Sequence, residues 1–381
     1  MDTTHSSPIV RARQFANRLG IRLPILLAPM AGACPPSLSI AVANAGGLGG
    51  CGALMMKPDE ITAWSEEFRK GSQGAFQINL WIPEAAPRRD FEVEKRQREF
   101  LGNWGPSVPP EAGNEVLPDF SAQCEAMLAA TPKVVSSIMG VYPPAFVSKL
   151  KSRGILWFAN ATTVDEARIA EQAGADGIVA QGMEAGGHRG AFRADEAEPK
   201  MVGLIALLPQ IADAVSVPVI AAGGIADGRG VAAALLLGAS AAQIGTGFLR
   251  SPEAKMHPAY AARLARTEAH ETAITRAFSG RPGRSVATAY VHAANAPDAP
   301  RPAPYPVQRG LTRAMRDAAQ KAGDAERMQL WAGQSAKLAR DLPAGTLSAR
   351  LWEDASRLLS QSSTPVSSAS KLRSTYGKAP R

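Results

Sequence analysis

Residues 177–190 read Gly-Ile-Val-Ala-Gln-Gly-Met-Glu-Ala-Gly-Gly-His-Arg-Gly, a short apolar run that passes into a glycine-rich segment. The run 178–180 is rich in β-branched side chains and is typical of a buried parallel strand. The segment 186–190 holds too many glycines for a helix or a strand, so we expect a loop whose backbone can approach a ligand closely. His188 and Arg189 lie in this loop, at the carboxyl end of the predicted strand, where parallel α/β proteins bind their ligands.

The same pattern recurs along the chain: a predicted helix, a few small residues that end it, and then a short apolar strand, as at 172–178. Each glycine at such a stop suits the end of a helix, and each apolar run suits an interior strand. The predicted strands are 25–28, 48–51, 75–80, 134–139, 155–159, 177–181, 217–222 and 242–246. Eight parallel strands with helices between them predict an α/β fold, a closed (β/α)8 TIM barrel, over an open doubly wound sheet.

The spacing of these signals divides the chain into four regions. We expect an N-terminal tail and short helix at 1–20, the barrel at 21–290, a C-terminal helical extension at 291–359, and a disordered tail at 360–381. Roughly fifty residues separate the third and fourth predicted strands, more than a simple crossover needs. We interpret this insertion, 82–131, as a lid over the barrel mouth, and a solvated decoration is the alternative.

The segments beyond the eighth predicted strand carry weaker signals. Composition favours helix at 252–275, a turn-rich loop at 278–284, an extended proline-heavy stretch at 292–310, and amphipathic helices at 311–342 and 347–359.

Composition narrows the classes of function. The net charge is +8, but much of the excess lies at the two ends, and aromatic residues make up only 6% of the chain with no basic stripe among them, so we expect no nucleic-acid partner. No apolar run approaches the ~20 residues of a membrane span, and no secretory signal opens the chain. Three cysteines without Cys-x-x-Cys spacing fit a reducing compartment. We therefore expect a cytoplasmic enzyme that binds no membrane.

Two further glycine-rich turns follow the seventh and eighth predicted strands. Gly223 and Gly224 end one strand, and Gly245 and Thr246 end the next, one βα unit later. Backbone N–H groups in such turns, beside helix N-termini, converge on anions, and barrels often bind phosphate after these two strands. The repeated feature predicts a phosphate-bearing ligand, and glycines needed only for tight turns are the alternative.

The other end of that ligand is expected near the first, third and sixth strands. Pro29, Met30 and Ala31 follow the first strand, Asn79 ends the third, and Gln181 ends the sixth. Small residues and a methionine against a planar ring, with amide side chains at its polar edge, suit a flavin isoalloxazine. The alternative for each amide is a satisfied polar group at a strand end.

His188 is the one histidine of five that lies in a glycine-rich loop at a strand end, which makes it the candidate acid or base. The sequence has no group of histidines and carboxylates with ligand spacing, so no metal site is expected. It also lacks a Gly-x-Ser-x-Gly nucleophile elbow. Whether Arg189 or Arg284 touches the substrate or only nearby carbonyls stays open at this point.

In combination, the segments 28–32, 181–190 and 222–229 resemble FMN-dependent nitronate monooxygenases, formerly called 2-nitropropane dioxygenases. The resemblance spans about 24–284, together with 331–335. It implies FMN at the mouth of a TIM barrel. It also implies oxidation of alkyl nitronates or nitroalkanes by O₂ to a carbonyl compound and nitrite, through one-electron transfer to the flavin. The partners would be the small nitronate and O₂, with a homodimer as one candidate assembly.

The resemblance also assigns individual residues. His188 matches the active-site histidine, which serves as a base where neutral nitroalkanes are substrates. The residues that would bind FMN are Pro29, Met30, Ala31, Asn79, Lys133, Gln181, Gly186, Gly187, Gly223, Gly224, Gln243, Gly245 and Thr246.

The chain departs from the family pattern in two places, and the first is that the insertion 82–131 carries few aromatic residues. Residues 136–140 read Ser-Ser-Ile-Met-Gly where the family has Ser-Phe-x-x-Gly, which bears on the expected substrate pocket and not on flavin binding. Two other functions stay open: a flavin-dependent enoyl-thioester (enoyl-ACP) reductase of the same superfamily, which would consume NAD(P)H, and a non-catalytic flavoprotein. Retention of His188 and of both glycine turns argues against the second.

Overall fold

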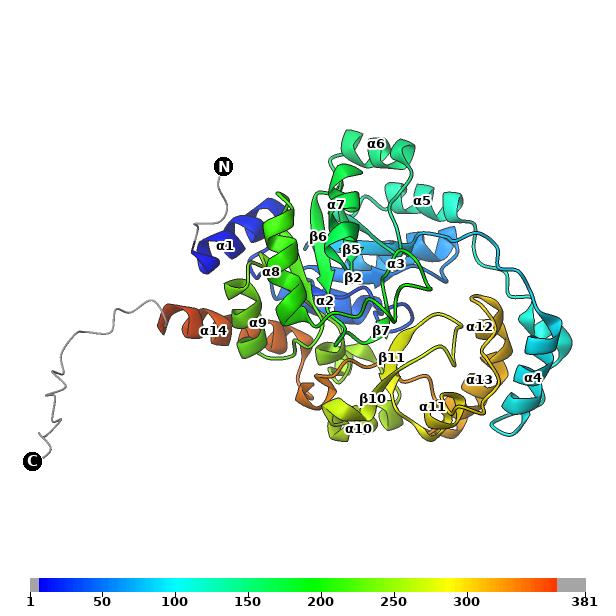
Figure 1. Ribbon diagram of the computed structural model, residues 1–381. Coiled ribbons are helices and arrows are strands. Elements are labelled where there is room, and N and C mark those ends of the chain that lie inside the picture. Colours follow the sequence, from blue (N-terminus) through cyan, green and yellow to red (C-terminus); the bar gives the residue numbers. More distant parts are fainter. Residues whose placement is uncertain (1–6, 362–381) are drawn as a thin grey trace, which may run out of the picture.

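A closed barrel of eight parallel strands forms the centre of the protein, as the computed structural model, which describes residues 7–361, shows (Figure 1). The strands neighbour one another in the order β1-β9-β8-β6-β5-β4-β3-β2, and a parallel bridge between Leu26 and Leu48 joins β1 to β2. Their bounds are β1 (Ile25–Leu27), β2 (Gly49–Gly52), β3 (Phe76–Trp81), β4 (Val134–Ile138), β5 (Leu156–Ala161), β6 (Gly177–Gln181), β8 (Val219–Ala222) and β9 (Ala241–Ile244). The predicted TIM barrel is confirmed, with strand ends shifted by one or two residues.

Helices pack around the outside of this barrel, one after each strand. They are α2 (Pro36–Asn44), α3 (Pro58–Gly71), α5 (Phe120–Ala129), α6 (Pro144–Ser152), α7 (Val164–Gln172), α8 (Leu204–Ala214), α9 (Gly228–Leu236) and α14 (Ala344–Gln361). Side chains that accept hydrogen bonds from the first turn fix several helix starts: Thr163 caps α7, and Asp227 caps α9. Within residues 7–361, no helix is both long enough and apolar enough to cross a membrane.

Alternation along the strands separates two layers of core. Inward-facing residues such as Val134, Phe158 and Ile220 form a cluster inside the barrel. Phe15 of α1 (Pro8–Leu19) belongs to that cluster and stacks on Phe158 with ring centroids 5.9 Å apart, so α1 closes one end of the barrel. Outward-facing residues such as Val135 pack under the helices in the larger cluster.

Two excursions leave the barrel at the carboxyl ends of its strands and pack on each other (Figure 1). The first, residues 82–119, follows β3 and contains α4 (Phe91–Gly102) and a 3₁₀ turn at Pro110–Gly113. The second, residues 245–343, follows β9. Its elements are α10 (Pro258–Arg266), β10 (Thr272–Thr275), β11 (Gly283–Val286), α11 (Ala289–Ala294), α12 (Val307–Leu311) and α13 (Arg313–Ala322). Leu101 from the first excursion packs with Phe278 and Leu311 from the second.

The second excursion corrects several sequence predictions. Residues 252–275 are not one helix, because α10 ends at Arg266 and 272–275 form strand β10. Gly283, expected in a loop, begins β11. β11 pairs antiparallel with β10 and with β7 (Gly187–His188), so part of the expected 186–190 loop is a short strand. The helix expected over 311–342 is continuous only through α13, and Gly323 at φ 68° ends it.

The boundaries of the regions also differ from the expected ones. α14 packs on α9 and α2 as the last helix of the barrel wall, so 291–359 is not a single extension. α5, inside the expected lid 82–131, packs on α3 and is likewise part of the wall. Of the tail expected at 360–381, Ser360 and Gln361 complete α14, and 362–381 lie outside the described residues, as do 1–6.

Candidate functional site

A cavity of about 860 Å³ opens at the carboxyl ends of the barrel strands. This volume lies in the upper part of the range, roughly 300–1,000 Å³, of small-molecule sites. Its lining includes His188 and all but one of the predicted cofactor residues: Pro29, Met30, Ala31, Asn79, Gln181, Gly186, Gly187, Gly223, Gly224, Gln243, Gly245 and Thr246. Residues far apart in the sequence thus meet at one rim, because every parallel strand ends there.

Lys133 is the predicted cofactor residue that does not line this cavity. It precedes β4 at the amino end of the strand, opposite to the end where the cavity opens. Side chains alternate between the two sides of a strand, and Lys133 is two residues from Val135, which faces the outer helices, while Val134 faces the inside of the barrel. Lys133 is therefore separated from the site in two ways: it lies at the opposite end of the strand, and it lies on the outer side of the sheet.

The glycine turns after β8 and β9 shape one end of the cavity. Gly223 and Gly224 adopt φ of 114° and 68°, conformations that side chains disfavour. Thr246 follows β9, and its Oγ1 accepts a hydrogen bond of 3.0 Å from the Gly333 N–H. The first turn of α9 is already occupied, because the Asp227 carboxylate accepts from the backbone N–H groups there. An anion at this end of the cavity would therefore be bound by the backbone of the glycine turns and not by the N-terminus of α9.

Close backbone packing joins the His188 segment to the second excursion. A Cβ added at Gly186 would lie 2.4 Å from the backbone nitrogen of Gly333, so only glycine fits there. Gly187, at φ 77°, lines the cavity, and a Cβ added there would meet no atom within 4 Å. The space beside Gly187 is thus open for a ligand.

The amide side chains at the rim are partly used by the protein itself. Gln181 donates from Nε2 to the His188 carbonyl at 3.1 Å and accepts from the Gly190 N–H at 2.8 Å, so it holds the loop. Asn79 donates to Ser136 Oγ at 3.1 Å. The Nδ2 of Asn160, a 7% exposed cavity residue on β5, has no hydrogen-bond partner. This Nδ2 packs closely against Gly190, where an added Cβ would clash with it, so the amide faces the His188 segment.

The imidazole of His188 is enclosed by aromatic side chains. Trp81 lies 4.7 Å from it, centroid to centroid, at an edge-on angle of 74°, and Trp331 lies 4.7 Å away at 57°. Nε2 lies 2.7 Å from Ser279 Oγ. The ring is thus fixed by two indoles and one hydroxyl at the cavity wall.

Burial is the main cause that lowers the pKa of His188 to about 3, and the positive charges of Arg281 and Arg309 are the further causes. Arg281 is itself buried and pairs with Glu84 at 2.6 Å, while Arg309 lines the cavity. His188 is therefore neutral at ordinary pH. The two guanidinium groups favour a negative ligand beside it.

Arg189 and Arg284 bind carbonyls of the His188 segment instead of projecting into the cavity. Arg189 is 1% exposed and donates to the Gly182 carbonyl at 2.7 Å and to the Gln181 carbonyl at 3.2 Å. Arg284 donates from Nε to the Met183 carbonyl at 2.9 Å. Burial lowers the pKa of Arg189 to about 10, with the charge of Arg284 as the second cause. Both arginines stabilise the loop that carries His188.

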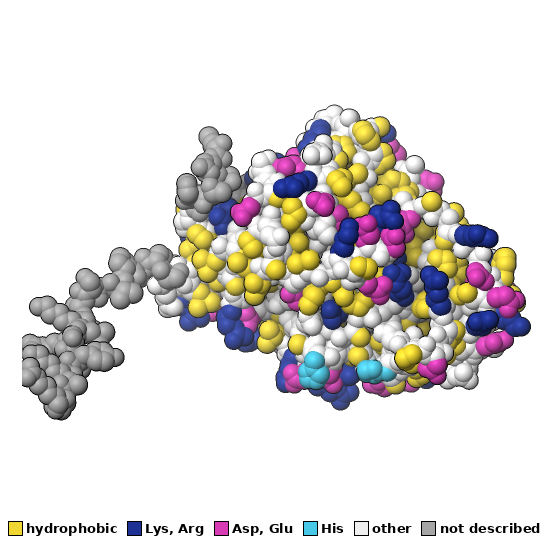
Figure 2. Space-filling view, viewed as in Figure 1, with side chains coloured by type: hydrophobic (Ala, Val, Ile, Leu, Met, Phe, Trp, Pro, Cys, Tyr) yellow, Lys and Arg dark blue, Asp and Glu magenta, His cyan; other side chains and the backbone are white. Residues whose placement is uncertain are grey.

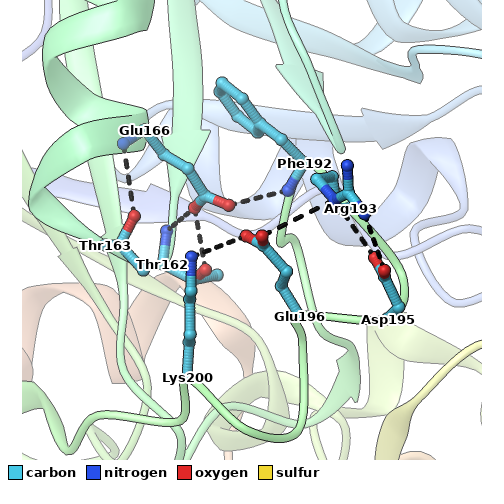
Figure 3. Close-up of polar contacts among 8 residues, drawn as sticks. All are labelled: Thr162, Thr163, Glu166, Phe192, Arg193, Asp195, Glu196 and Lys200. Carbon is cyan, nitrogen blue, oxygen red and sulfur yellow. Dashed lines mark hydrogen bonds and ion pairs between the residues drawn. The ribbon is translucent and has the colours of Figure 1, made fainter.

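The chain beyond His188 is fastened by a buried carboxylate (Figure 3). Glu166 of α7 accepts hydrogen bonds from the Thr162 N–H at 2.7 Å, from its hydroxyl at 2.8 Å, and from the Phe192 N–H at 2.7 Å. Outside this group, Arg193 pairs with Asp195 at 2.7 Å on the surface. The segment that leaves the cavity is thereby tied to the end of β5.

Known proteins of similar sequence and structure share this architecture. The family model described as nitronate monooxygenase matches residues 14–354. A nitronate monooxygenase of Paraburkholderia phytofirmans is 40% identical over 351 residues, which cover 90% of this chain and 95% of that protein. A solved nitroalkane oxidase from Streptomyces ansochromogenes is 36% identical, with a TM-score of 0.83 over 92% of this chain and 100% of its own. FabK from Thermotoga maritima is 28% identical, with a TM-score of 0.70 over 91% and 97%.

The chain belongs to the nitronate monooxygenase family. Within this family member, sequence reasoning missed five residues around His188 and along the cavity: Trp81, Ser279, Arg309, Arg316 and Trp331. Trp331 lies in a segment that carried the resemblance, so its position was available as a signal. The others lie in the two excursions or at their edges, where no local pattern points to the cavity. No three His, Cys, Asp or Glu side chains among residues 7–361 come together as a metal site.

The low pKa of His188 predicts how stability depends on pH. Below the ordinary value of 6.5 the unfolded chain takes up a proton at this residue, whereas the folded protein does so only near pH 3, so stability is lost as the pH falls between these values. From pH 7 to pH 5 the free energy of unfolding should fall by about 2 kcal/mol more in the wild type than in His188→Gln. Urea unfolding of both proteins at the two pH values measures this difference. An equal fall in both would mean that His188 titrates normally when folded.

Proposed function

We propose that this member of the nitronate monooxygenase family binds FMN in the barrel cavity and oxidises alkyl nitronates with O₂ to a carbonyl compound and nitrite. The observation that carries the proposal is the meeting, in one cavity, of the glycine turns after β8 and β9 with a neutral His188 enclosed by Trp81 and Trp331. The family's other members support a flavin-dependent oxidoreductase. The proposal that the flavin is FMN rests on how the cavity residues fit this cofactor.

The residues present fit FMN in two parts. The backbone of Gly223, Gly224, Gly245 and Thr246 would hold the phosphate, as glycine-rich turns do. The segment 29–31 would lie against the isoalloxazine. When bound, FMN supplies the transfer of electrons from the substrate to O₂.

The wall around His188 suits an anionic substrate. The charges of Arg281 and Arg309 reach His188, and the pairing of Arg281 with Glu84 and of Arg309 with Glu115 at 3.7 Å reduces the resulting positive potential without reversing its sign at the imidazole. A nitronate enters as an anion and gains from this potential. A neutral nitroalkane must first lose its α-proton, and His188 accepts that proton only as the nitronate forms beside it, because the two charges then stabilise each other. We therefore expect preformed nitronates to be the better substrates.

The experiment that tests the reaction mixes the purified protein with propionate-3-nitronate or propyl-2-nitronate without oxygen and follows the flavin absorbance. The flavin should be reduced, and nitrite should appear when air is admitted. A flavin that stays oxidised with nitronates but bleaches rapidly with NADH or NADPH would contradict the proposal and favour the enoyl-thioester reductase. The likeness to FabK is weaker than that to the nitroalkane oxidase, which favours the first outcome.

Cofactor binding can be tested at Gly187. The change Gly187→Ala places a methyl group in the open space beside the cavity, so FMN affinity should fall at least tenfold, or about 1.4 kcal/mol. Flavin retained after gel filtration and a fluorescence titration of the apoprotein measure the loss.

The matched control for this change is Gly20→Ala. Gly20 has φ 71°, close to the 77° of Gly187, and a Cβ there also meets no atom within 4 Å, but Gly20 lies at the end of α1 away from the cavity. Both changes should cost about 1–2 kcal/mol of stability through the left-handed backbone. Equal FMN affinity in the two variants would show that Gly187 does not face the cofactor.

The role of His188 is tested by His188→Asn. This variant should keep FMN but turn over a neutral nitroalkane roughly 10²–10⁴-fold more slowly, because the proton acceptor is lost. Turnover of the preformed nitronate should change much less, since it needs no proton transfer. Steady-state kinetics with 2-nitropropane and its nitronate give the two values. The same loss with both substrates would mean that His188 is not the base.

A further inference from the structure

Ser279 faces the imidazole of His188 from the second excursion. It is 2% exposed, and its Oγ lies 2.7 Å from His188 Nε2. The residue stands in a tight turn before β11, at which Gly280 has φ 86° and a Cβ added to it would lie 2.3 Å from the Ala303 carbonyl oxygen. The position of Ser279 is thus set by a turn that only glycine permits.

The hydrogen bonds around Ser279 decide which nitrogen of His188 carries the proton. The Arg281 N–H lies 3.3 Å from Ser279 Oγ and donates to it, and the Arg281 carbonyl, also at 3.3 Å, is placed to accept the hydroxyl proton. A hydroxyl has one proton and two lone pairs. If that proton goes to the Arg281 carbonyl, the oxygen accepts from both Arg281 N–H and His188 Nε2–H, and all three bonds form. If it goes to Nε2, the bond to the carbonyl is lost.

The surroundings of the ring keep this arrangement in place. Trp81 and Trp331 pack on it, each with a centroid distance of 4.7 Å, and oppose rotation about the side chain. The backbone is held by the pairing of His188 with Gly283 and by the bond from Gln181 to the His188 carbonyl. Among residues 7–361, no carboxylate forms an ion pair with His188. The ring therefore has a neutral partner, Ser279.

We propose that Ser279 is a positioning residue that fixes His188 as the Nε2–H tautomer, so that Nδ1 is the nitrogen free to meet the substrate. The identity of that substrate rests on the proposed function. When Nδ1 takes the α-proton of a nitroalkane, the C–H bond breaks, its electron pair passes into the nitro group to give the nitronate, and a new N–H bond forms. Nε2–H remains bonded to Ser279 throughout. Because the hydroxyl orients the ring without adding negative charge, the nitronate is left as the partner of the imidazolium.

The direct test is ¹⁵N NMR of the FMN-loaded protein labelled at histidine, at neutral pH. His188→Asn identifies the signals of His188 among those of the five histidines. We expect Nε2 to resonate as a protonated and Nδ1 as an unprotonated imidazole nitrogen. The opposite assignment, or two averaged signals, in the wild-type protein would overturn the proposal without need of any variant.

Two variants extend this test. Ser279→Ala should give averaged nitrogen signals, keep FMN, and slow turnover of a neutral nitroalkane roughly tenfold, the rate equivalent of about one hydrogen bond, with less effect on a preformed nitronate. Ser279→Thr, which keeps a hydroxyl, should restore the wild-type spectrum.

Ser348→Ala is the matched control, because Ser348 is also buried and its hydroxyl bonds only the Ala344 carbonyl in α14. It should change neither readout.

The NMR result separates this proposal from the proposed function, since the tautomer is measured in the resting protein. An Nε2–H tautomer in a protein that does not oxidise nitronates would refute the function alone. Nitronate oxidation with unchanged His188 signals in Ser279→Ala would refute the role of Ser279 alone.

Discussion

The pairing of β7 with β11 is the constraint on which the site depends. His188 stands on a segment rich in glycine, and such a backbone by itself would populate many conformations. Gly187 and His188 pair with Arg284 and Gly283, and the next residue, Arg189, donates its N–H to the Pro282 carbonyl at 2.9 Å. A strand of two residues is stable here because the excursion that supplies β11 is itself packed on the barrel. The loop that carries His188 is therefore rigid only in the complete fold.

Burial of that loop sets the chemistry available to it. An imidazole without water around it and with two guanidinium groups nearby is a weak base, because its charged form loses solvation and is repelled. The same surroundings stabilise an anion. In the proposed reaction, proton transfer from carbon to His188 would thus be unfavourable until negative charge develops on the substrate, so the site would favour the transition state and the nitronate. A solvated histidine of ordinary pKa would be a stronger base but would not distinguish these states.

The sequence predicted the barrel and the glycine turns that line the cavity, because both depend on local signals. Each strand is a short apolar run, and each glycine turn follows its own strand. The substrate side could not be predicted in this way. Ser279 is separated from His188 by 91 residues, and the two meet only because β11 pairs with β7. Gln181, which the sequence predicts to contact a flavin ring, also hydrogen-bonds His188 and Gly190 in the structure, and these bonds within the loop are not visible in a linear pattern.

The departure from the family pattern at 136–140 has its explanation in the outer layer of the barrel. The Ser137 hydroxyl accepts a hydrogen bond of 3.0 Å from the Trp157 indole and donates to the Gly140 carbonyl at 3.1 Å. Trp157 is fully buried and belongs to the cluster under the helices, so Ser137 points to that side. A phenylalanine at 137 would compete with the indole for the same space. Ser137 also lines the cavity, as do Ile138 and Trp81, so the exchange bears both on packing between strands and helices and on the cavity wall.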